Sequence, residues 1–483
     1  MISVRFAPIL PEIVVLCGAS AILIIDAFLP ATRRHISFWL TQLVLLGAAV
    51  AAYATMPRAP SATLSGMVVD DVLSDTLQFM ACVSVSLTLF YSRTYCAARG
   101  LFRGETFVLT LFALLGMMVM IAAGSYVTLY LGLELLALSL YAMVAMYRTS
   151  NAASEAAMKY FVLGALASGM TLYGMSMVYG ATGSLDIGQV ATALAGGTGN
   201  RTILLFGLVF LVSGVAFKLG AVPYHMWVPD VYDGAPTAVT LLIGTAPKLA
   251  AYAFMLRLLG VSLGSLWFDW QGMLMILALL SMILGNVIAI AQTNIKRMLA
   301  YSAIANMGFM LMGFLAANPM GYSAAMFYVV AYVLTSLASF GMIMLLSRDG
   351  FEADKLDDFR GLNQRSPWWA FVMLVVMFSL AGIPPTVGFY AKFTVIQAAV
   401  DAGFVWLAVV AVMSSLVGAF YYLRLVKLMY FDAPAEPDAM PIVARGDARA
   451  LLSVNGLALL FFGMLPQPLL ELCAVAFTYS GLL

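Results

Sequence analysis

Charged side chains, cysteine and histidine are all scarce in this sequence, and each shortage excludes a class of protein. Charged residues make up only 10% of the 483 positions, whereas soluble domains carry about 25%. Because 63% of the residues are hydrophobic, we expect a polytopic membrane protein. The net charge of +1 and the lack of a basic or acidic tail give no indication of nucleic-acid binding.

Cysteine and histidine are too few for a metal or redox centre. The four cysteines include no CxxC pair and have no neighbouring histidine, which argues against zinc or iron–sulfur binding. Of the two histidines only His225 lies near an apolar stretch, and one histidine cannot supply both axial ligands of a haem. No P-loop is present, and the glycine-rich segment 196–199 follows no strand. We therefore expect this chain to bind no cofactor and no metal.

Fourteen apolar stretches, bounded by proline, glycine or charge, are long enough to cross a bilayer as helices. The predicted fold class is therefore an all-α polytopic membrane protein. The expected spans cover residues 9–29, 36–56, 71–91, 105–123, 125–147, 157–180, 203–228, 237–259, 272–292, 299–315, 320–347, 368–400, 404–425 and 450–472.

Lysine and arginine are distributed unevenly between the two sides of these spans. Of the 24 basic residues, four lie on the side of the N-terminus: Arg5, Arg58, Arg201 and Arg257. Sixteen lie in loops on the opposite side, Lys296 among them. Loops rich in lysine and arginine stay in the cytoplasm. We therefore expect both termini to face away from the cytoplasm.

The four remaining basic residues lie inside expected spans: Lys159, Lys218, Lys248 and Lys392. Glu134 is the one acid near the middle of a span. A charge at the bilayer centre costs about 3 kcal/mol, so we expect these five side chains to be functional groups that face a hydrated interior. The alternatives are snorkelling for Lys159, which has Glu155 beside it, and structural ion pairs for the others. Other acids lie nearer span ends, where a side chain reaches the interface at low cost: Glu12, Asp26, Asp75 and Glu471.

Three of these lysines lie close to a proline that interrupts a helix. Proline removes a backbone donor and clashes with the carbonyl four residues earlier, so Pro223 should free the carbonyl of Leu219, next to Lys218. The other two lysines also follow prolines: Pro247 precedes Lys248, and Pro384 and Pro385 precede Lys392. Irregular backbone at membrane depth needs protein or water to satisfy it. Each break therefore predicts a small water-accessible pocket beside a lysine.

The proline breaks belong to a sequence repeat. Residues 156–160 read AAMKY, residues 324–328 read AAMFY, and the span after each contains a proline break. Two units of five spans, spans 4–8 and 9–13, fit this spacing, and an odd number of spans inverts the second unit. Discontinuous helices at corresponding places in inverted repeats indicate a transport site near the midplane. The expected organisation is a three-helix segment (1–104), a first repeat that forms a proton half-channel (105–259), a second, inverted repeat (272–425), and a C-terminal loop with the last span (426–483).

A carboxylate and an amine in such a site can act as a proton switch. At about 4 Å and an effective dielectric constant near 20, a Glu–Lys contact is worth roughly 4 kcal/mol. Moving Glu134 toward or away from Lys218 would therefore make the lysine hold or release a proton. We expect Lys248 and His225 to pass protons along waters to Lys392, since histidine titrates near neutral pH. Capping of the helix break is the alternative role for His225.

Several segments resemble the antiporter-like membrane subunits of respiratory complex I, which are related to multisubunit cation/proton antiporters and membrane hydrogenases. The most specific is FKLGAVPYHMWVPDVYDGAPT at 217–237, and others lie at 9–29, 131–145, 295–308 and 380–393, so that the resemblance covers nearly the whole chain. It implies fourteen helices with two inverted five-helix repeats. It also implies roles for the buried charges: Glu134 and Lys218 as the coupling pair, Lys248 as central relay, Lys392 as the outlet-side residue, and Lys159 as an additional lysine near the pair.

By the same resemblance, the complex transfers electrons from NADH to a quinone through FMN and iron–sulfur clusters in other subunits, while this chain pumps protons. Expected neighbours are an antiporter-like M subunit, small K and J type subunits, and membrane lipids. Three features indicate one subunit type: an end after fourteen spans, Pro11-Glu12 with Asp26 in the first span, and Lys392 where the M subunit usually has glutamate. The alternative is a subunit of a cation/proton antiporter without redox partners. A passive scaffold would leave four buried lysines unexplained.

Overall fold

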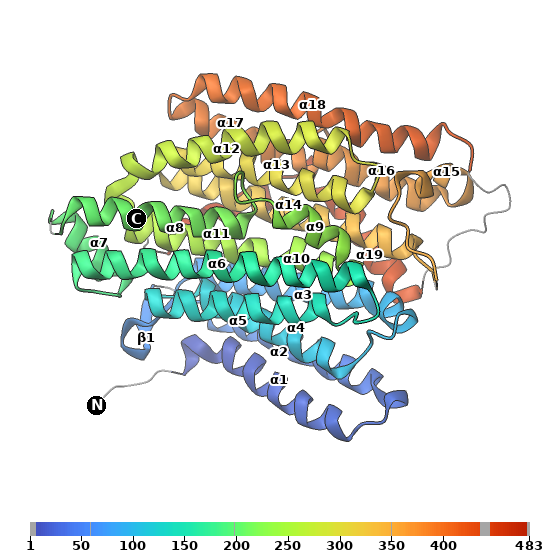
Figure 1. Ribbon diagram of the computed structural model, residues 1–483, viewed down its shortest axis with the longest axis horizontal. Helices are drawn as coiled ribbons and strands as arrows, with labels where there is room; N and C mark the ends of the chain where they lie inside the picture. Colours follow the sequence, from blue (N-terminus) through green and yellow to red (C-terminus); the bar gives the residue numbers. More distant parts are fainter. Residues whose placement is uncertain (1–5, 58, 198, 349, 435–444, 481–483) are drawn as a thin grey trace.

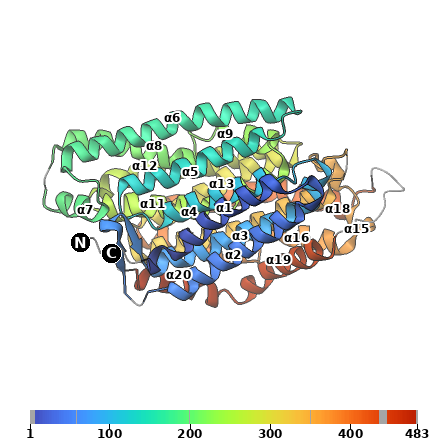
Figure 2. The same ribbon diagram turned by 90° about the horizontal axis from the view of Figure 1, so that it is seen from below.

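A bundle of long helices that share one axis makes up almost the whole molecule (Figure 1). The computed structural model describes residues 6–57, 59–197, 199–348, 350–434 and 445–480. The helix α7 (Ile187–Ala195) lies at one end of the bundle and α15 (Leu362–Arg365) at the other, at left and right in both Figure 1 and Figure 2. These are called the α7 end and the α15 end below.

The first three spans form one flank of the bundle. They are α1 (Leu10–Phe28), α2 (His35–Thr55) and α3 (Val72–Ala98). Between α2 and α3 the short strands β1 (Ser61–Thr63) and β2 (Val68–Asp70) pair antiparallel at the α7 end.

Two groups of five spans follow. The first group is α4 (Gly104–Ile121), α5 (Tyr126–Ala145), α6 (Asn151–Thr182), the pair α8 (Arg201–Leu219) and α9 (Trp227–Gly234), and the pair α10 (Thr237–Gly244) and α11 (Ala246–Met255), which continues into the π-helical segment η4 (Leu256–Ser262). The second group is α12 (Trp267–Ile290), α13 (Ile295–Leu315), α14 (Pro319–Leu346), the pair α16 (Pro367–Ala381) and α17 (Val387–Asp401), and α18 (Val405–Tyr430).

The last span is α19 (Gly446–Met464), followed by the short helix α20 (Gln467–Thr478). The remaining elements are 3-10 turns: η1 (Ala7–Ile9), η2 (Ala31–Arg33), η3 (Leu64–Gly66), η5 (Gly264–Leu266) and η6 (Leu356–Phe359).

The expected count of fourteen spans agrees with this architecture. Within the described residues, thirteen helices are long and apolar enough to cross a membrane singly. The helices α16 and α17 have only 15 residues each, and a helix of that length rises about 22 Å, less than the hydrocarbon core. Joined end to end across their break, they supply the fourteenth span.

Side-chain caps fix the starts of several helices, and glycines end the first halves of the two broken ones. The side chains of Ser125, Asn200 and Asn294 accept backbone N–H groups at the starts of α5, α8 and α13. The helices α8 and α16 both end at a left-handed glycine, Gly220 and Gly382, a conformation that favours glycine. The two broken helices therefore stop by the same local device.

The first two helices of each group also pack alike, through close backbone contact at glycines. A Cβ on Gly116 of α4 would lie 2.4 Å from the backbone nitrogen of Leu136 on α5. In the second group a Cβ on Gly285 of α12 would lie 2.8 Å from the backbone nitrogen of Ala305 on α13. Small residues let transmembrane helices approach in this way, and the equal placement agrees with a structural repeat.

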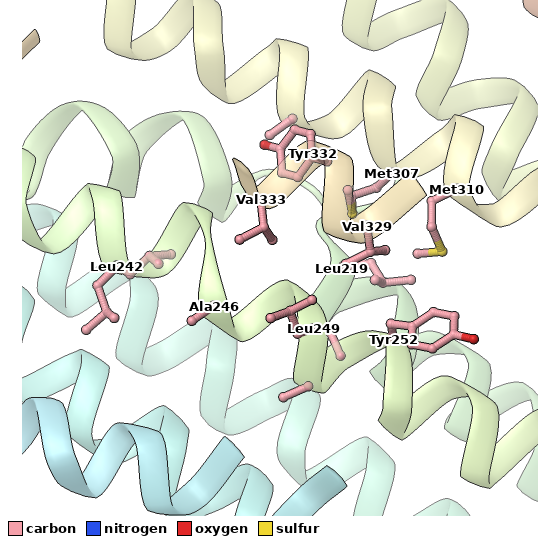
Figure 3. Packing of buried hydrophobic residues seen from close by; sticks show 14 of the residues in the cluster. Leu219, Leu242, Ala246, Leu249, Tyr252, Met307, Met310, Val329, Tyr332 and Val333 are labelled. Atoms are coloured by element: carbon pink, nitrogen blue, oxygen red, sulfur yellow. The ribbon is translucent and has the colours of Figure 1, made fainter. Parts of the chain in front are cut away.

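Buried apolar side chains fill the region where the two groups meet. Figure 3 shows this packing, with side chains from α8, α10 and α11 on one side and from α13 and α14 on the other: Leu219, Leu242, Ala246, Leu249 and Tyr252 against Met307, Met310, Val329, Tyr332 and Val333. The broken helix α8 therefore ends inside the molecule, surrounded by apolar side chains.

Four charged groups lie deeper than the sequence predicted. Arg257 was expected in a loop, but η4 extends the span and buries it, and its guanidinium pairs with Asp71 at 2.7 Å. Lys296 was also expected in a loop, but α13 begins at Ile295 and buries it. The expectation of interface positions for two acids is likewise wrong, because Asp75 is 3% exposed and one carboxyl oxygen of Glu12 is buried. Of the basic residues assigned to the N-terminal side, Arg5 and Arg58 lie outside the described residues, as does part (435–444) of the C-terminal loop.

Candidate functional site

Two of the predicted lysines line one internal cavity. Lys218 at the end of α8 and Lys248 on α11 both face it, together with Leu136 of α5, Tyr160 of α6 and Trp227 of α9. About 30 Å³ of it is open to water-sized molecules, and one water needs about 10–15 Å³ on this measure. The cavity therefore has room for about two waters, and the seven helices that wall it all belong to the five spans of the first group.

Lys248 supplies the donor that the first proline break removes. Its Nζ donates a hydrogen bond of 2.9 Å to the carbonyl of Leu219, the carbonyl that Pro223 was expected to free. The ammonium is almost fully buried, with 2% of the residue exposed. A buried carbonyl without a donor would cost about 1–3 kcal/mol, so Lys248 stabilises the broken end of α8.

Lys392 does the same at the second break. Its Nζ donates to the carbonyl of Ala381 at 3.0 Å, the carbonyl four residues before Pro385. It also donates to Oγ of Ser415 on α18 at 2.9 Å, and that hydroxyl lies 3.2 Å from the same carbonyl. The corresponding carbonyl in each break is therefore bound by a lysine: from the next span at the first break, and from the second half of the broken helix at the second.

A second, smaller cavity lies beside Lys392. It has about 10 Å³ open to a water-sized molecule and is lined by polar groups that include Asn306, Tyr328, Thr335 and Ser379. The Tyr328 hydroxyl donates to Oδ1 of Asn306 at 2.7 Å, and the Asn306 amide donates to the carbonyl of Ser302 at 2.8 Å. These contacts give Lys392 a hydrogen-bonded surrounding within the second group.

The Ser302 hydroxyl extends this chain by bonding to the Tyr422 hydroxyl on α18 at 2.6 Å. Ser302 and Asn306 were absent from the residues singled out in the sequence. Their signal is two polar residues four positions apart in the mostly apolar part of α13 that follows Arg297, and this spacing places them on one face of the helix.

Glu134 lies on α5 between two residues that line the first cavity, Leu133 and Leu136. Its Oε1 atom is buried and has no hydrogen-bond partner. Among the described residues Glu134 and Lys218 form no ion pair within 4 Å, although the charge of Glu134 does act on Lys218. The pair is thus open in this structure.

Lys159 lies apart from the cavity, in a network of ion pairs. Its ammonium contacts Glu155 at 2.8 Å and Asp230 of α9 at 2.7 Å, and its side chain is 43% exposed. Asp230 also holds Arg297 of α13 at 3.1 Å, and Arg297 approaches Asp233 at 3.7 Å. The lysine is therefore one member of a cluster that ties α6 and α13 to the second half of the broken helix.

His225 lies in the break between α8 and α9 but does not line the cavity of Lys218 and Lys248. Its backbone carbonyl accepts the N–H of Val228, which opens α9, and its Nδ1 atom is buried without a partner. Over the described part of the chain, no group of three or more His, Cys, Asp or Glu side chains is placed to hold a metal ion.

The fold and the two lysine-capped breaks can now be compared with known proteins. Residues 123–418 match the family model described as NADH:quinone oxidoreductase/Mrp antiporter, TM. The chain belongs to this family. The matched region begins just before α5 and ends within α18, so it contains both breaks and all four lysines.

Relatives in this family match almost the whole chain. NADH-quinone oxidoreductase subunit N of Thiobacillus denitrificans is 61% identical over 472 residues, which is 98% of this chain and 97% of that protein. The protein of the same name from Nitrosomonas europaea is 56% identical over 475 residues and 98% of each chain.

Solved structures of family members share the fold. A chain of respiratory complex I from Thermus thermophilus superposes with a TM-score of 0.82 at 32% identity, covering 96% of this chain and 99% of that one. A chain of the Mrp complex from Dietzia sp. superposes with a TM-score of 0.86, covering 99% and 98%; at 22% identity this likeness shows the fold alone.

Proposed function

We propose that this chain is the N-type, proton-translocating membrane subunit of a bacterial NADH:quinone oxidoreductase. The observation that carries the proposal is the pair of buried lysines, Lys248 and Lys392, which bind corresponding freed carbonyls at the two helix breaks. Subunit N relatives with up to 61% identity over 98% of the chain support the assignment to this complex. The chain would take part in the translocase reaction without redox chemistry of its own.

In this proposal the proton moves along the buried charges of the two groups. Lys218 and Lys248 share a cavity with room for water, so a proton can pass between them through one water molecule. The open Glu134–Lys218 pair is one state of the switch, and closing it would hold a proton on Lys218. Lys392, with Ser415 and the polar chain through Asn306, would pass the proton onward.

The auxiliary roles follow from position. Lys159 would act through Asp230, which it shares with Arg297, by fixing the second half of the broken helix. His225 would relay protons only if the break rearranges, because in this structure it lies outside the cavity.

We further propose the four-part organisation expected from the sequence: 1–104, a first repeat at 105–259, an inverted repeat at 272–425, and 426–483. The left-handed glycines that end α8 and α16 and the glycine contacts of α4–α5 and α12–α13 support it. The inner membrane, with the α7 end toward the periplasm, is the proposed location.

The proposed partners are the M subunit, the small K and J type subunits, and membrane lipids. FMN, iron–sulfur clusters and quinone would belong to other subunits of the complex. The relatives and the complex I structure support a place in a multisubunit assembly.

Proton uptake by inside-out vesicles tests the proposal. We expect Lys218→Ala to reduce NADH-driven proton uptake at least tenfold while the complex still assembles, because the variant removes a cation that lines the cavity. Lys427→Ala is the control. Lys427 lies in the last turn of α18, its side chain is 68% exposed, and among the described residues it pairs with Asp432 at 3.8 Å. Wild-type uptake in an assembled Lys218→Ala complex would contradict the site. If that variant does not assemble, Lys218→Met and Lys218→Arg make the same comparison with the side-chain volume retained.

The antiporter alternative predicts a different result. A cation/proton antiporter would exchange sodium for protons in vesicles without NADH, and the exchange would be unaffected by loss of the redox subunits. Uptake that depends on NADH favours the proposed complex.

A further inference from the structure

A group of acidic side chains at the α7 end takes no part in the proposed lysine pathway. Glu12 lies at the start of α1, Asp70 ends β2, Asp71 caps α3, and Asp75 lies in the first turn of α3. Gln78, one turn further along α3, is 2% exposed. The one cation paired with these carboxylates within the described residues is Arg257 of η4. Negative charges therefore outnumber positive charges here.

One carboxylate of this group is fully satisfied. Asp71 accepts hydrogen bonds from the backbone N–H and the hydroxyl of Ser74 at 2.7 and 2.9 Å, and it pairs with Arg257 at 2.7 Å. Three strong donors on two oxygens are what an ionised carboxylate needs in a buried place. The positive charge of Arg257 is therefore balanced by Asp71 and not by the other acids.

Each of the other three acids has one carboxyl oxygen without a donor. Oε2 of Glu12, Oδ1 of Asp70 and Oδ2 of Asp75 are all buried without a hydrogen-bond partner. A buried ionised carboxylate without a partner is so costly that the group takes up a proton instead. Asp70, which lies outside the spans, shows the effect, because burial raises its pKa to about 6.

The hydrogen bonds of Gln78 are independent evidence for the position of a proton. Its amide nitrogen donates to Oε1 of Glu12 at 2.6 Å and to the carbonyl of Met118 on α4 at 3.4 Å, so both amide hydrogens are used and the orientation of the amide is fixed. Its own oxygen, Oε1, is then left buried with no donor. An amide oxygen can only accept a hydrogen bond. The neighbouring acid, Glu12, also has a buried oxygen without a hydrogen-bond partner.

We propose that Glu12 carries a proton at neutral pH and, with Gln78 and Asp75, forms a proton-binding site separate from the lysines. A proton on Oε2 of Glu12 can be donated to Oε1 of Gln78, which closes a cyclic acid–amide pair beside the existing 2.6 Å bond. One proton then satisfies two of the unpartnered atoms at once. Asp75, which is 3% exposed and whose Oδ2 has no hydrogen-bond partner among the described residues, is the nearby group that can take up or release a second proton.

The titratable groups around this site come from three elements besides α1. They are Asp70 at the end of β2, Asp71 and Asp75 at the start of α3 with the buried thiol of Cys82 one turn beyond Gln78, and Arg257 on η4. Arg257 connects the site to the lysine pathway, because η4 directly continues α11, which carries Lys248. At the proposed periplasmic end, the site would lie where translocated protons leave the protein. That use in transport rests on the proposed function, whereas the protonation of Glu12 does not.

Infrared spectroscopy of the assembled complex at neutral pH tests the protonation directly. We expect the spectrum to lose the C=O absorption of one protonated carboxyl group in Glu12→Gln, whose amide can still donate to Gln78. The matched control is Glu471→Gln, because Glu471 also accepts from a glutamine, Gln467 at 3.0 Å, but on the exposed surface of α20. That control should lose only an ionised-carboxylate band.

A second variant keeps the test decisive if Glu12→Gln does not assemble. In Gln78→Leu the acid loses its amide partner, so the band of a protonated Glu12 should move to the higher frequency of a free carboxyl group. An unchanged acid C=O region in either variant would overturn the proposal. A loss of proton pumping in Lys218→Ala without any change in this band would leave the two sites distinct, as proposed.

Discussion

A lysine that donates to the carbonyl left free by a proline break is the device on which both halves of this protein depend. Lys248 is the one side-chain donor to the Leu219 carbonyl among the described residues, whereas the Ala381 carbonyl has both Lys392 and Ser415. The two breaks therefore differ in how much each depends on its lysine, and this difference is measurable.

We expect Lys248→Met to destabilise the complex more than Lys392→Met. Both variants remove a buried ammonium, so the difference between them reports the carbonyl that loses its donor, about 1–3 kcal/mol. The midpoint of thermal dissociation of the purified complex gives the comparison. The double variant Lys392→Met/Ser415→Ala should approach the cost of Lys248→Met. If the midpoints of all three variants equalled that of the wild-type complex, the lysines would not stabilise the breaks.

The sequence identified these lysines because charge is so scarce in an apolar chain. The position of Pro223 also predicted that the carbonyl of Leu219 would be free, and this is the oxygen that Lys248 binds. Glu12 and Asp75 were misplaced because distance from a span end does not reveal burial by neighbouring helices. The partner of each buried group depends on packing between distant segments, as with Gln78 and Glu12, which are 66 positions apart.

At the scale of elements, ion pairs connect the second half of the first broken helix to two neighbouring helices. The helix α9 has eight residues, and Asp230 on it joins Lys159 of α6 to Arg297 of α13. Asp233, one turn later, forms an ion pair with Arg297 and accepts a hydrogen bond from Asn294, and both partners lie at the start of α13. Asp230 alone ties α6 to this short helix through an ion pair among the described residues.

We expect Asp230→Asn to loosen α9 and Asp233→Asn to do so much less. Partly exposed ion pairs contribute about 0.2–1 kcal/mol each, so the assembled complex should survive while local opening becomes severalfold more frequent. Hydrogen–deuterium exchange of the amides in 221–234 measures this directly. Equal exchange in the two variants would contradict a special role for Asp230.

The sequence predicted the spans, but it predicted only some of the places where their helices are interrupted. The expected breaks at Pro223 and Pro384-Pro385 are present, and the fourteen spans are recovered within a few residues at most ends. The π-helical η4 was not foreseen, because a run of apolar residues carries no signal for a change in helical hydrogen bonding. That change decides the position of Arg257, which is buried against Asp71 rather than exposed in a loop.

At the scale of the whole molecule, the two ends of the bundle differ in charge. The loops at the α15 end carry most of the arginines and lysines, including Arg33, Arg99, Arg348 and Arg360. The α7 end holds the start of α1 and the helix α20, and its acidic group includes Asp70 at the end of β2. The direction of proton transfer depends on the orientation of the bundle in the membrane. We expect this charge asymmetry to fix that orientation.

Cysteine labelling of intact cells tests that orientation. We expect a membrane-impermeant thiol reagent to label Thr192→Cys, an exposed position on α7, and to leave Asp357→Cys unlabelled, although the Asp357 side chain is 71% exposed at the α15 end. Basic loops remain in the cytoplasm, which is the physical reason for the difference. Both variants should be built on Cys17→Ser, because Cys17 is the exposed one of the four native cysteines. Inside-out vesicles should reverse the labelling pattern, and the opposite result in both preparations would place the acidic group on the cytoplasmic face and make it an entry site for protons instead of an exit.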